Sequence, residues 1–484
     1  MGQPYTKPFL TVSEQVDRLT ERGLDIGTAE YATSLLQRVG YYRLSGYWHL
    51  FRELEPSPPG TPTVEDETAR PERRKSTFVA GSTLSTVHKI YDFDRALRIR
   101  IFAALEMVEV SLRFRIGHML GRSHAYAHRD PAHLLPEFTG HTGSTPELVY
   151  SRWLDSNHAE WLREVDREEN RSNETFVAHF TTKYGGPLPV WVVTEILSFG
   201  TLSRLYSGME RAHQDRIAAA FGILNSVPNG DGSLTGNWLN HLRYIRNTCA
   251  HHARLWNKNI TVQLAEPTGI PELAHLTLTK TRSRIYGTLA VLAFLTERIH
   301  PGNGWRTDTL QFVCENIDRL GLNLTLLGFP AQWDTLDIWQ THYTPSHHDW
   351  DQKQELLDQL QTIPAGEAGR VLRPEEDQAK RLKWVRYLRD KGFLLGLRLA
   401  TAYEYPDFQL DPATGNVHPI ISTANSRLLG NPKTATPENA DAARWAAARW
   451  WTTTPPASDH SPVEQFVAGE LTLERLDQML PPTQ

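Results

Sequence analysis

The chain has 484 residues, of which 40% are hydrophobic and 22% charged, and its formal net charge is -5. This composition predicts a globular protein of two or three domains and argues against a disordered chain. Because the protein as a whole is not basic, any nucleic-acid site has to be a local patch. Cys249 and Cys314 are the only cysteines, too few for a disulfide scaffold or a four-cysteine zinc site.

Several features favour a cytoplasmic protein without a membrane partner. Residues 1–15 lack the long apolar core of a secretory signal. The most apolar run, residues 289–295, is far shorter than a membrane span. The scarcity of cysteine suits a reducing compartment. No glycine-rich loop ends in Lys-Ser or Lys-Thr, so we expect no ATP or GTP cofactor.

The N-terminal segment predicts two short helices. A capping box of Thr11 with Glu14, or Ser13 as the N-cap, starts the first helix, and the second covers residues 27–39. The aromatic run at residues 41–48 suits either packing between helices or stacking on RNA bases. We favour packing for this run.

A Pro-rich, charged stretch at residues 55–75 predicts a surface loop. Ser82 then caps a long helix that runs to about Leu120. Its apolar positions step by three and four residues, as an amphipathic helix requires: Ile90, Phe93, Leu97, Ile101, Leu105, Val108, Leu112 and Ile116.

Further helices are predicted at residues 150–170, 189–209, 237–256 and 281–300. The composition changes after residue 345, where prolines and glycines mark a linker over residues 346–375. The remainder mixes helices with short strand-like pieces and turns. We therefore predict a mainly α fold, with a helical domain at residues 1–345 and a small α+β domain at residues 376–484.

The most informative segment is HLRYIRNTCAHHARLWN, residues 241–257. It contains Arg246, Asn247 and His251, and no acidic residue. Such a stretch indicates a polyanionic partner. We expect the basic residues around the motif to bind RNA: Arg243, Arg254 and Lys258.

These residue types suit cleavage of RNA without a metal ion. RNA carries its own nucleophile, the 2′-hydroxyl. A histidine titrates near neutral pH and can take or give the proton. An arginine stabilises the charge that grows on the phosphate. An asparagine can orient the imidazole or hold a phosphate oxygen.

Helical spacing indicates how the groups meet. Asn247 and His251 are four residues apart and share a face, whereas Arg246 and His251 are about 140° apart around the helix. The reaction needs a general acid as well as a general base, but one motif supplies only one histidine. His252 is a supporting candidate, and a two-fold dimer would bring in a second His251.

The spacing of Arg246 and His251 is weakly specific by itself, since Arg113 and His118 repeat it on the long helix. For that pair we favour a solvated helical face. A metal site is not expected, because Cys249, His251 and His252 on one helix cannot close a tetrahedral site.

Five ordered runs resemble the Abi-like family, the AbiD/AbiF abortive-infection proteins of bacteria. They are YYRLSGYWHLF, IYDFDRALRIRIFAALEMVEVSLRFRIGHML, PLPVWVVTEILSFGTLSRLYSGM, LRYIRNTCAHHARLWN and LLGFPAQWDTLDIW. The runs lie between residues 41 and 339, and the resemblance covers roughly residues 10–340.

The resemblance implies a HEPN-type helical bundle, a ribonuclease site of the Arg-x4-6-His type at a dimer interface, and antiphage defence by cutting RNA. It carries the catalytic roles onto Arg246, Asn247 and His251. It also implies a small noncoding RNA as a partner of some members. Glu109 and Arg113 match a recurrent polar pair of the family and are expected to support the site.

The C-terminal part resembles the toxin-binding domain of Xre/MbcA/ParS antitoxins, with Tyr405–Gln409 carrying most of the likeness. Such a domain would restrain the toxin or bind a partner. The predicted function is thus an abortive-infection ribonuclease toxin. The alternatives are a noncatalytic RNA-binding regulator and a protein-interaction scaffold in phage defence.

Overall fold

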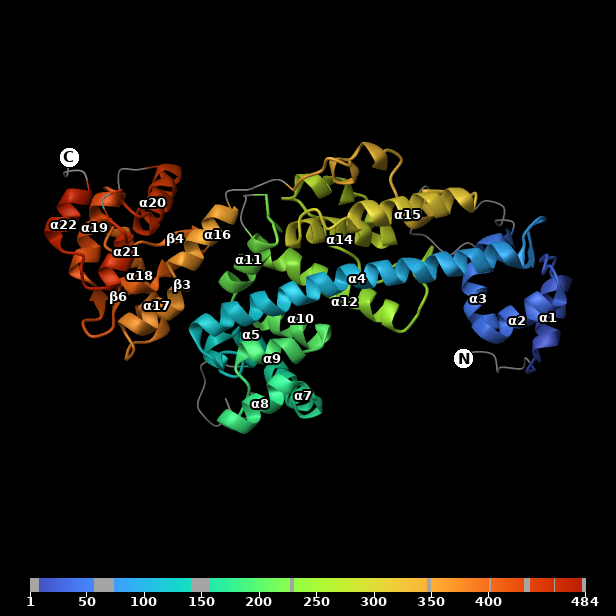
Figure 1. Cartoon of the computed structure of the whole chain (residues 1–484), viewed down its shortest axis with the longest axis horizontal. Coiled ribbons are helices and arrows are strands. Elements are labelled where there is room, and N and C mark those ends of the chain that lie inside the picture. The colour runs from blue at the N-terminus through green and yellow to red at the C-terminus, as the bar shows by residue number, and fades with distance from the viewer. Residues whose placement is uncertain are drawn as a thin grey trace.

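A computed structural model describes residues 8–55, 74–140, 156–226, 230–345, 350–399, 402–430, 436–456 and 458–480. The fold is mainly helical, as predicted, with small sheets only. The protein is elongated, with the N-terminal helices at one end and the C-terminal unit at the other (Figure 1). The predicted loop at residues 55–75 lies mostly outside the described residues.

Three short helices and a strand pair form the N-terminal end. Their bounds are α1 (Val12–Glu21), α2 (Ala29–Val39), α3 (Tyr41–Trp48), β1 (Arg52–Leu54) and β2 (Arg74–Phe78). Thr11 and Glu14 form the predicted capping box of α1. The two strands pair antiparallel. In the aromatic run of α3, Tyr47 and Trp48 are buried, as the packing interpretation requires, whereas Tyr42 is exposed.

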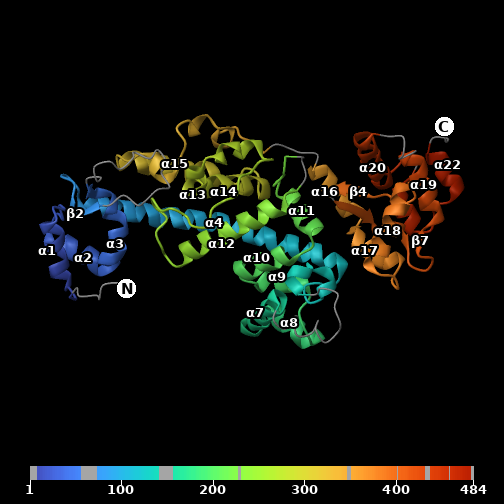
Figure 2. The ribbon, with the colours of Figure 1, turned by 180° about the vertical axis from the view of Figure 1, so that it is seen from behind.

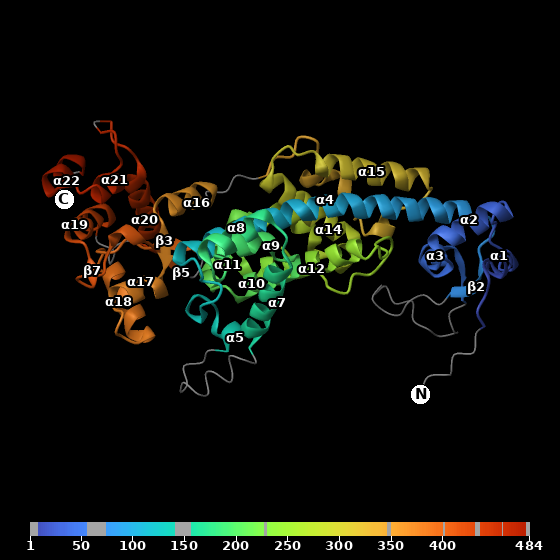
Figure 3. The same ribbon diagram turned by 60° about the horizontal axis from the view of Figure 1, so that its bottom comes forward.

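The long helix α4 (Leu84–Ser123) crosses the molecule and joins its two ends (Figures 1 and 3). All eight apolar positions predicted from the periodicity are buried. Its N-cap is Thr83, whose side chain accepts a hydrogen bond from the backbone of Thr86, so the prediction of Ser82 was wrong by one residue. The Ser82 hydroxyl donates to the carbonyl of Val79 instead.

Helices cover α4 on several sides (Figure 2). The helices before the motif are α5 (Pro136–Thr139), α7 (Asn157–Arg171), α8 (Thr175–Tyr184), α9 (Val190–Ile196), α10 (Phe199–Gly208) and α11 (Arg211–Ala220). Of these, α9, α10 and α11 pack on α4. The motif helix is α12 (Gly232–Ala250). After it come α13 (Thr279–Ser283), α14 (Ile285–Ile299) and α15 (Trp305–Arg319).

The close approach of α9 to α4 depends on two glycines one turn apart. A Cβ at Gly117 would lie 2.8 Å from Oγ1 of Thr194 and 3.1 Å from Cα of Trp191. A Cβ at Gly121 would lie 2.8 Å from the Trp191 ring. Larger residues would push α9 outward, and the segment after α9 contributes to the site described below.

The C-terminal unit has its own hydrophobic core. Its helices are α16 (Trp350–Gln359), α17 (Ala365–Leu372), α18 (Gln378–Asp390), α19 (Pro419–Leu429), α20 (Pro437–Thr452), α21 (Pro462–Val467) and α22 (Leu473–Met479). A three-stranded antiparallel sheet has the order β3 (Thr362–Pro364), β5 (Ala402–Pro406), β4 (Leu397–Leu399). A second pair joins β6 (Leu410–Asp411) to β7 (Asn416–Val417).

The segment at residues 346–375, which we expected to be a linker, contains α16, β3 and α17. Leu357, Leu360 and Leu372 from this segment are buried in the second core. The prolines and glycines there bound short elements, such as Pro364 at the N-cap of α17. Within the described residues, no helix is both long and apolar enough to cross a membrane.

Candidate active site

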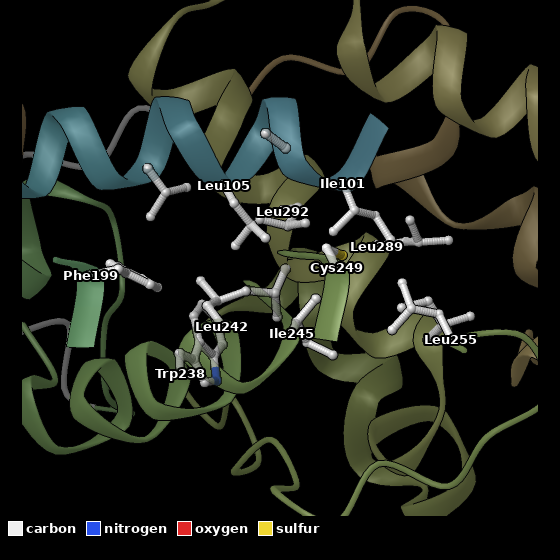
Figure 4. Packing of buried hydrophobic residues seen from close by; sticks show 14 of the residues in the cluster. Ile101, Leu105, Phe199, Trp238, Leu242, Ile245, Cys249, Leu255, Leu289 and Leu292 are labelled. Carbon is white, nitrogen blue, oxygen red and sulfur yellow. The ribbon is translucent and has the colours of Figure 1, made fainter. Parts of the chain in front are cut away.

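The buried face of α12 determines which side chains of the motif point toward solvent. Leu242, Ile245 and Cys249 are buried, and they lie opposite α4 in Figure 4. The outward face carries Asn240 and Asn247, which are exposed. No acid lies on α12, so its solvent face is polar without negative side chains.

The helix ends inside the motif, not at residue 256 as predicted. The backbone N–H of His251 donates to the carbonyl of Asn247 at 2.9 Å. The N–H of His252 then donates to Cys249 and that of Ala253 to Thr248, at 3.0 and 2.9 Å. This is a Schellman motif. His252, with φ 55°, takes the left-handed position usually occupied by glycine.

Asn247 and His251 are exposed next to each other on this last turn. The Arg246 side chain is partly buried and turns toward α4, where its guanidinium carbon lies 5.7 Å from the centroid of the Phe102 ring. Its Nε atom is buried without a hydrogen-bond partner in the described part of the chain. No hydrogen bond among the described residues joins the three side chains of the motif.

Arg246 meets Glu109 and Arg113 at a surface cavity of about 420 Å³. Nη2 of Arg113 lies 2.7 Å from Oε1 of Glu109. Arg113 also donates to the carbonyls of Glu195 and Leu197, at 2.9 and 3.0 Å. Arg113, paired with Glu109, therefore fastens the C-terminal end of α9 to α4 beside the motif arginine.

The repeated Arg-x4-His spacing on α4 has a different structure from the motif. We expected a solvated face for Arg113 and His118. Arg113 is only 22% exposed and makes the bonds described above, whereas His118 is exposed and stacks on Phe114 at 5.5 Å. Desolvation of the part of the ring that packs on the protein lowers the pKa of His118.

The three basic residues expected to bind RNA have different contacts. Arg243 donates to Asn240 at 2.8 Å and lines a cavity of about 600 Å³ with Arg204. Arg254 donates to the carbonyl of Gly46 at 2.5 Å, which ties the loop after α12 to α3. Lys258 lies 5.4 Å from the centroid of the Tyr244 ring.

Two other residues of the segment are structural. His241 is fully buried, and burial lowers its pKa to about 4. Burial likewise raises the pKa of the Cys249 thiol to about 12, so this thiol is neither a nucleophile nor a ready metal ligand. Across the described ranges, no three His, Cys, Asp or Glu side chains gather in a way that could hold a metal ion.

A buried network around Asp94 holds the loop that follows the motif, and sequence reasoning missed it. Asp94 accepts hydrogen bonds from the hydroxyl of Tyr47 at 2.6 Å and the backbone N–H of Trp256 at 2.7 Å, and it pairs with Arg98. The signal was available, because Asp94 and Arg98 fall among the apolar positions of α4. A charged pair on a buried helical face indicates a partner from another element.

The comparisons with known proteins identify one region. Residues 34–257 match the model of the family described as Abi-like protein. The matched region ends one residue after Trp256, whose backbone is held by Asp94. No match was found among curated proteins or among solved structures.

Proposed function

Residues 34–257 belong to the Abi-like family, and from this premise we propose that the protein is an antiphage abortive-infection endoribonuclease. It cleaves RNA without a metal ion, at a HEPN-type site formed by Arg246, Asn247 and His251. The observation that carries the proposal is the exposure of Asn247 and His251 on one turn, beside a cavity lined by Arg246.

The chemistry follows from the groups that each residue offers. His251 takes the proton of the 2′-hydroxyl, and the 2′-oxygen attacks the adjacent phosphorus. The bond to the 5′-oxygen breaks, and that oxygen receives a proton from a second acid. Arg246 stabilises the charge on the phosphate oxygens, and Asn247 orients the imidazole or a phosphate oxygen. The products carry 2′,3′-cyclic phosphate and 5′-hydroxyl ends.

A homodimer supplies the second acid in this proposal. The exposed face of α4 carries an apolar stripe of Val110 and Phe114, which lie one turn apart and are 52 and 65% exposed. Contiguous apolar surface of this kind marks interaction sites. Glu109 and Arg113, on the same part of α4, line the cavity that Arg246 also lines, so a second copy on this stripe would place its own motif close to the first. In this proposal His252 supports the site through its backbone and not through its ring.

The C-terminal unit is the regulatory part of the proposal. Its likeness to antitoxin toxin-binding domains suggests a restraint or a docking module, and a small noncoding RNA is a second candidate regulator. The unit bonds to the helical region through side chains of α4 and α11. Arg122 pairs with Asp358 at 3.3 Å, and Arg216 pairs with Glu404 at 2.7 Å.

The decisive experiment is RNA cleavage by the purified protein in the presence of EDTA. We expect His251→Ala to lower the rate by about 10²- to 10⁴-fold, the usual contribution of general acid–base catalysis. His179→Ala is the matched control, because it removes another exposed histidine from α8. End analysis should detect 2′,3′-cyclic phosphates.

Two outcomes would contradict the proposal. Equal cleavage by the His251→Ala variant would remove the catalytic role of the motif, and loss of cleavage in EDTA would point to a metal. A protein that binds RNA in a salt-sensitive way but never cleaves it would be the noncatalytic regulator.

A further inference from the structure

The largest of the cavities beside the motif lies on the side of His252. It has a volume of about 1010 Å³ and is walled by the end of α2, by α3, by α4 and by the end of α12. We call it the arginine cavity, after Arg38, Arg43, Arg95 and Arg98 in its lining. It is distinct from the smaller cavity that holds Arg246, Glu109 and Arg113.

The charge of the arginine cavity favours an anion. Among its described lining residues, Glu106 is the only acid. Arg98 is neutralised by Asp94, which leaves Arg38, Arg43 and Arg95, all exposed. Arg43 is held in place, because its Nη1 donates to the carbonyl of His252 at 2.6 Å. Guanidinium groups arranged in this way suit phosphate oxygens.

The same cavity has an apolar wall. Phe102 and Ile99 line it and are 40 and 60% exposed. A nucleobase can stack on an exposed aromatic ring while its phosphates bind arginine. Arg246 lies on the same Phe102 ring, at 5.7 Å. The ring therefore joins the arginine cavity to the motif.

We propose that the arginine cavity binds a single-stranded segment of the RNA, with its phosphates on Arg38, Arg43 and Arg95 and a base on Phe102. The proposal rests on the proposed function for the identity of the ligand as RNA. A duplex does not fit this arrangement, because its bases are already stacked on one another and cannot reach the ring. The strand would enter the site past His252.

The test uses the full-length protein in the His251→Ala background, so that bound RNA stays intact. Binding of a fluorescent single-stranded oligonucleotide is measured by anisotropy over a series of salt concentrations. We expect Arg38→Gln with Arg95→Gln to weaken binding at least about tenfold. The plot of the logarithm of the binding constant against the logarithm of the salt concentration should also become less steep. Its slope should change by about 1.4, because two phosphate contacts are lost.

A matched control removes two exposed arginines elsewhere, Arg319→Gln on α15 and Arg386→Gln on α18. This variant should bind as the parent does. Phe102→Leu keeps an apolar side chain but loses the ring, and should weaken binding about tenfold through lost stacking. Arg43 is left unchanged because it also holds the backbone of His252.

Unaltered binding by the Arg38/Arg95 variant would overturn the proposal, as would a duplex RNA that competes as well as the single strand. An acidic peptide that displaces the oligonucleotide at equal concentration would assign the cavity to a protein partner instead. Failure of the proposed function is separate, since it appears as absence of cleavage by the parent protein. In that case, weaker RNA binding by the Arg38/Arg95 variant would still support the arginine cavity as an RNA-binding site.

Discussion

Arg216 of α11 and Glu404 of β5 form an ion pair at 2.7 Å in which both side chains are 1% exposed. Glu404 also accepts a hydrogen bond from Thr362 at 2.5 Å, and Arg216 reaches Asp358 at 2.6 Å. The pair joins the helical region to the C-terminal unit where water is excluded. Removing one partner from such a pair leaves an uncompensated buried charge.

We therefore expect Arg216→Met to destabilise the protein by about 3–5 kcal/mol, measured by urea unfolding. The double variant Arg216→Met with Glu404→Leu should recover a large part of that loss, because it buries no lone charge. If Arg216→Met lowers the free energy of unfolding by less than about 1 kcal/mol, the pair is not desolvated as described.

Acid should weaken the fold through His241. The Val262 carbonyl can only accept, so Nδ1 of His241 carries the hydrogen and donates to it at 2.6 Å, while Nε2 accepts from the Thr288 hydroxyl at 2.8 Å. The folded protein thus keeps this histidine neutral, with a pKa of about 4. The unfolded chain takes up a proton near pH 6.5.

Because the folded pKa is depressed, stability is fully present above pH 6.5 and is lost as the pH falls toward 4. The contribution of His241 to the free energy of unfolding falls by about 3 kcal/mol over this range. His241→Gln should flatten the pH dependence of the unfolding free energy in that window, at a cost in stability at neutral pH. Identical slopes for the variant and the parent would contradict the assignment.

The long helix was predictable to within a few residues, because the spacing of its apolar side chains is a property of the sequence alone. The first N-terminal helix followed in the same way from its capping residues, Thr11 and Glu14. The end of α12 was not predictable, since it depends on His252 adopting a left-handed conformation and on Asp94 binding the next turn. The partnership of Arg246 with Glu109 and Arg113 joins residues far apart in the chain, which helical spacing cannot indicate.

The left-handed His252 gives a third prediction. A non-glycine residue with φ 55° is strained, and glycine at this position removes the strain at some cost in chain entropy. We expect His252→Gly to stabilise the protein by up to about 1 kcal/mol, measured by thermal unfolding. Ala253→Gly, in the same loop but without a positive φ, should destabilise it slightly.

The same variant separates the two histidines chemically. His252 contacts Arg43 through its backbone carbonyl, which glycine keeps. Cleavage by His252→Gly should therefore equal that of the parent. A loss of activity as large as that of His251→Ala would instead give the His252 ring a chemical role.

The apolar stripe of α4 gives a fourth prediction. A charge at Phe114 would have to be desolvated in a dimer interface, so Phe114→Glu should raise the dissociation constant of the proposed homodimer at least about tenfold. Sedimentation velocity measures this directly. Val467→Glu is the control, because it places the same charge at a 73% exposed position on α21. A parent protein that stays monomeric at all concentrations would refute the dimer.

Helix α4 has 40 residues and so spans about 60 Å. Near its start, Asp94 and Arg98 hold the backbone that follows the motif. At its end, Ser123 donates to Glu367 at 3.0 Å, and Arg122 lies against Asp358. Because α4 is one continuous helix, a tilt of its C-terminal end would be transmitted to the residues near its start as a rigid-body displacement, without any unfolding between them.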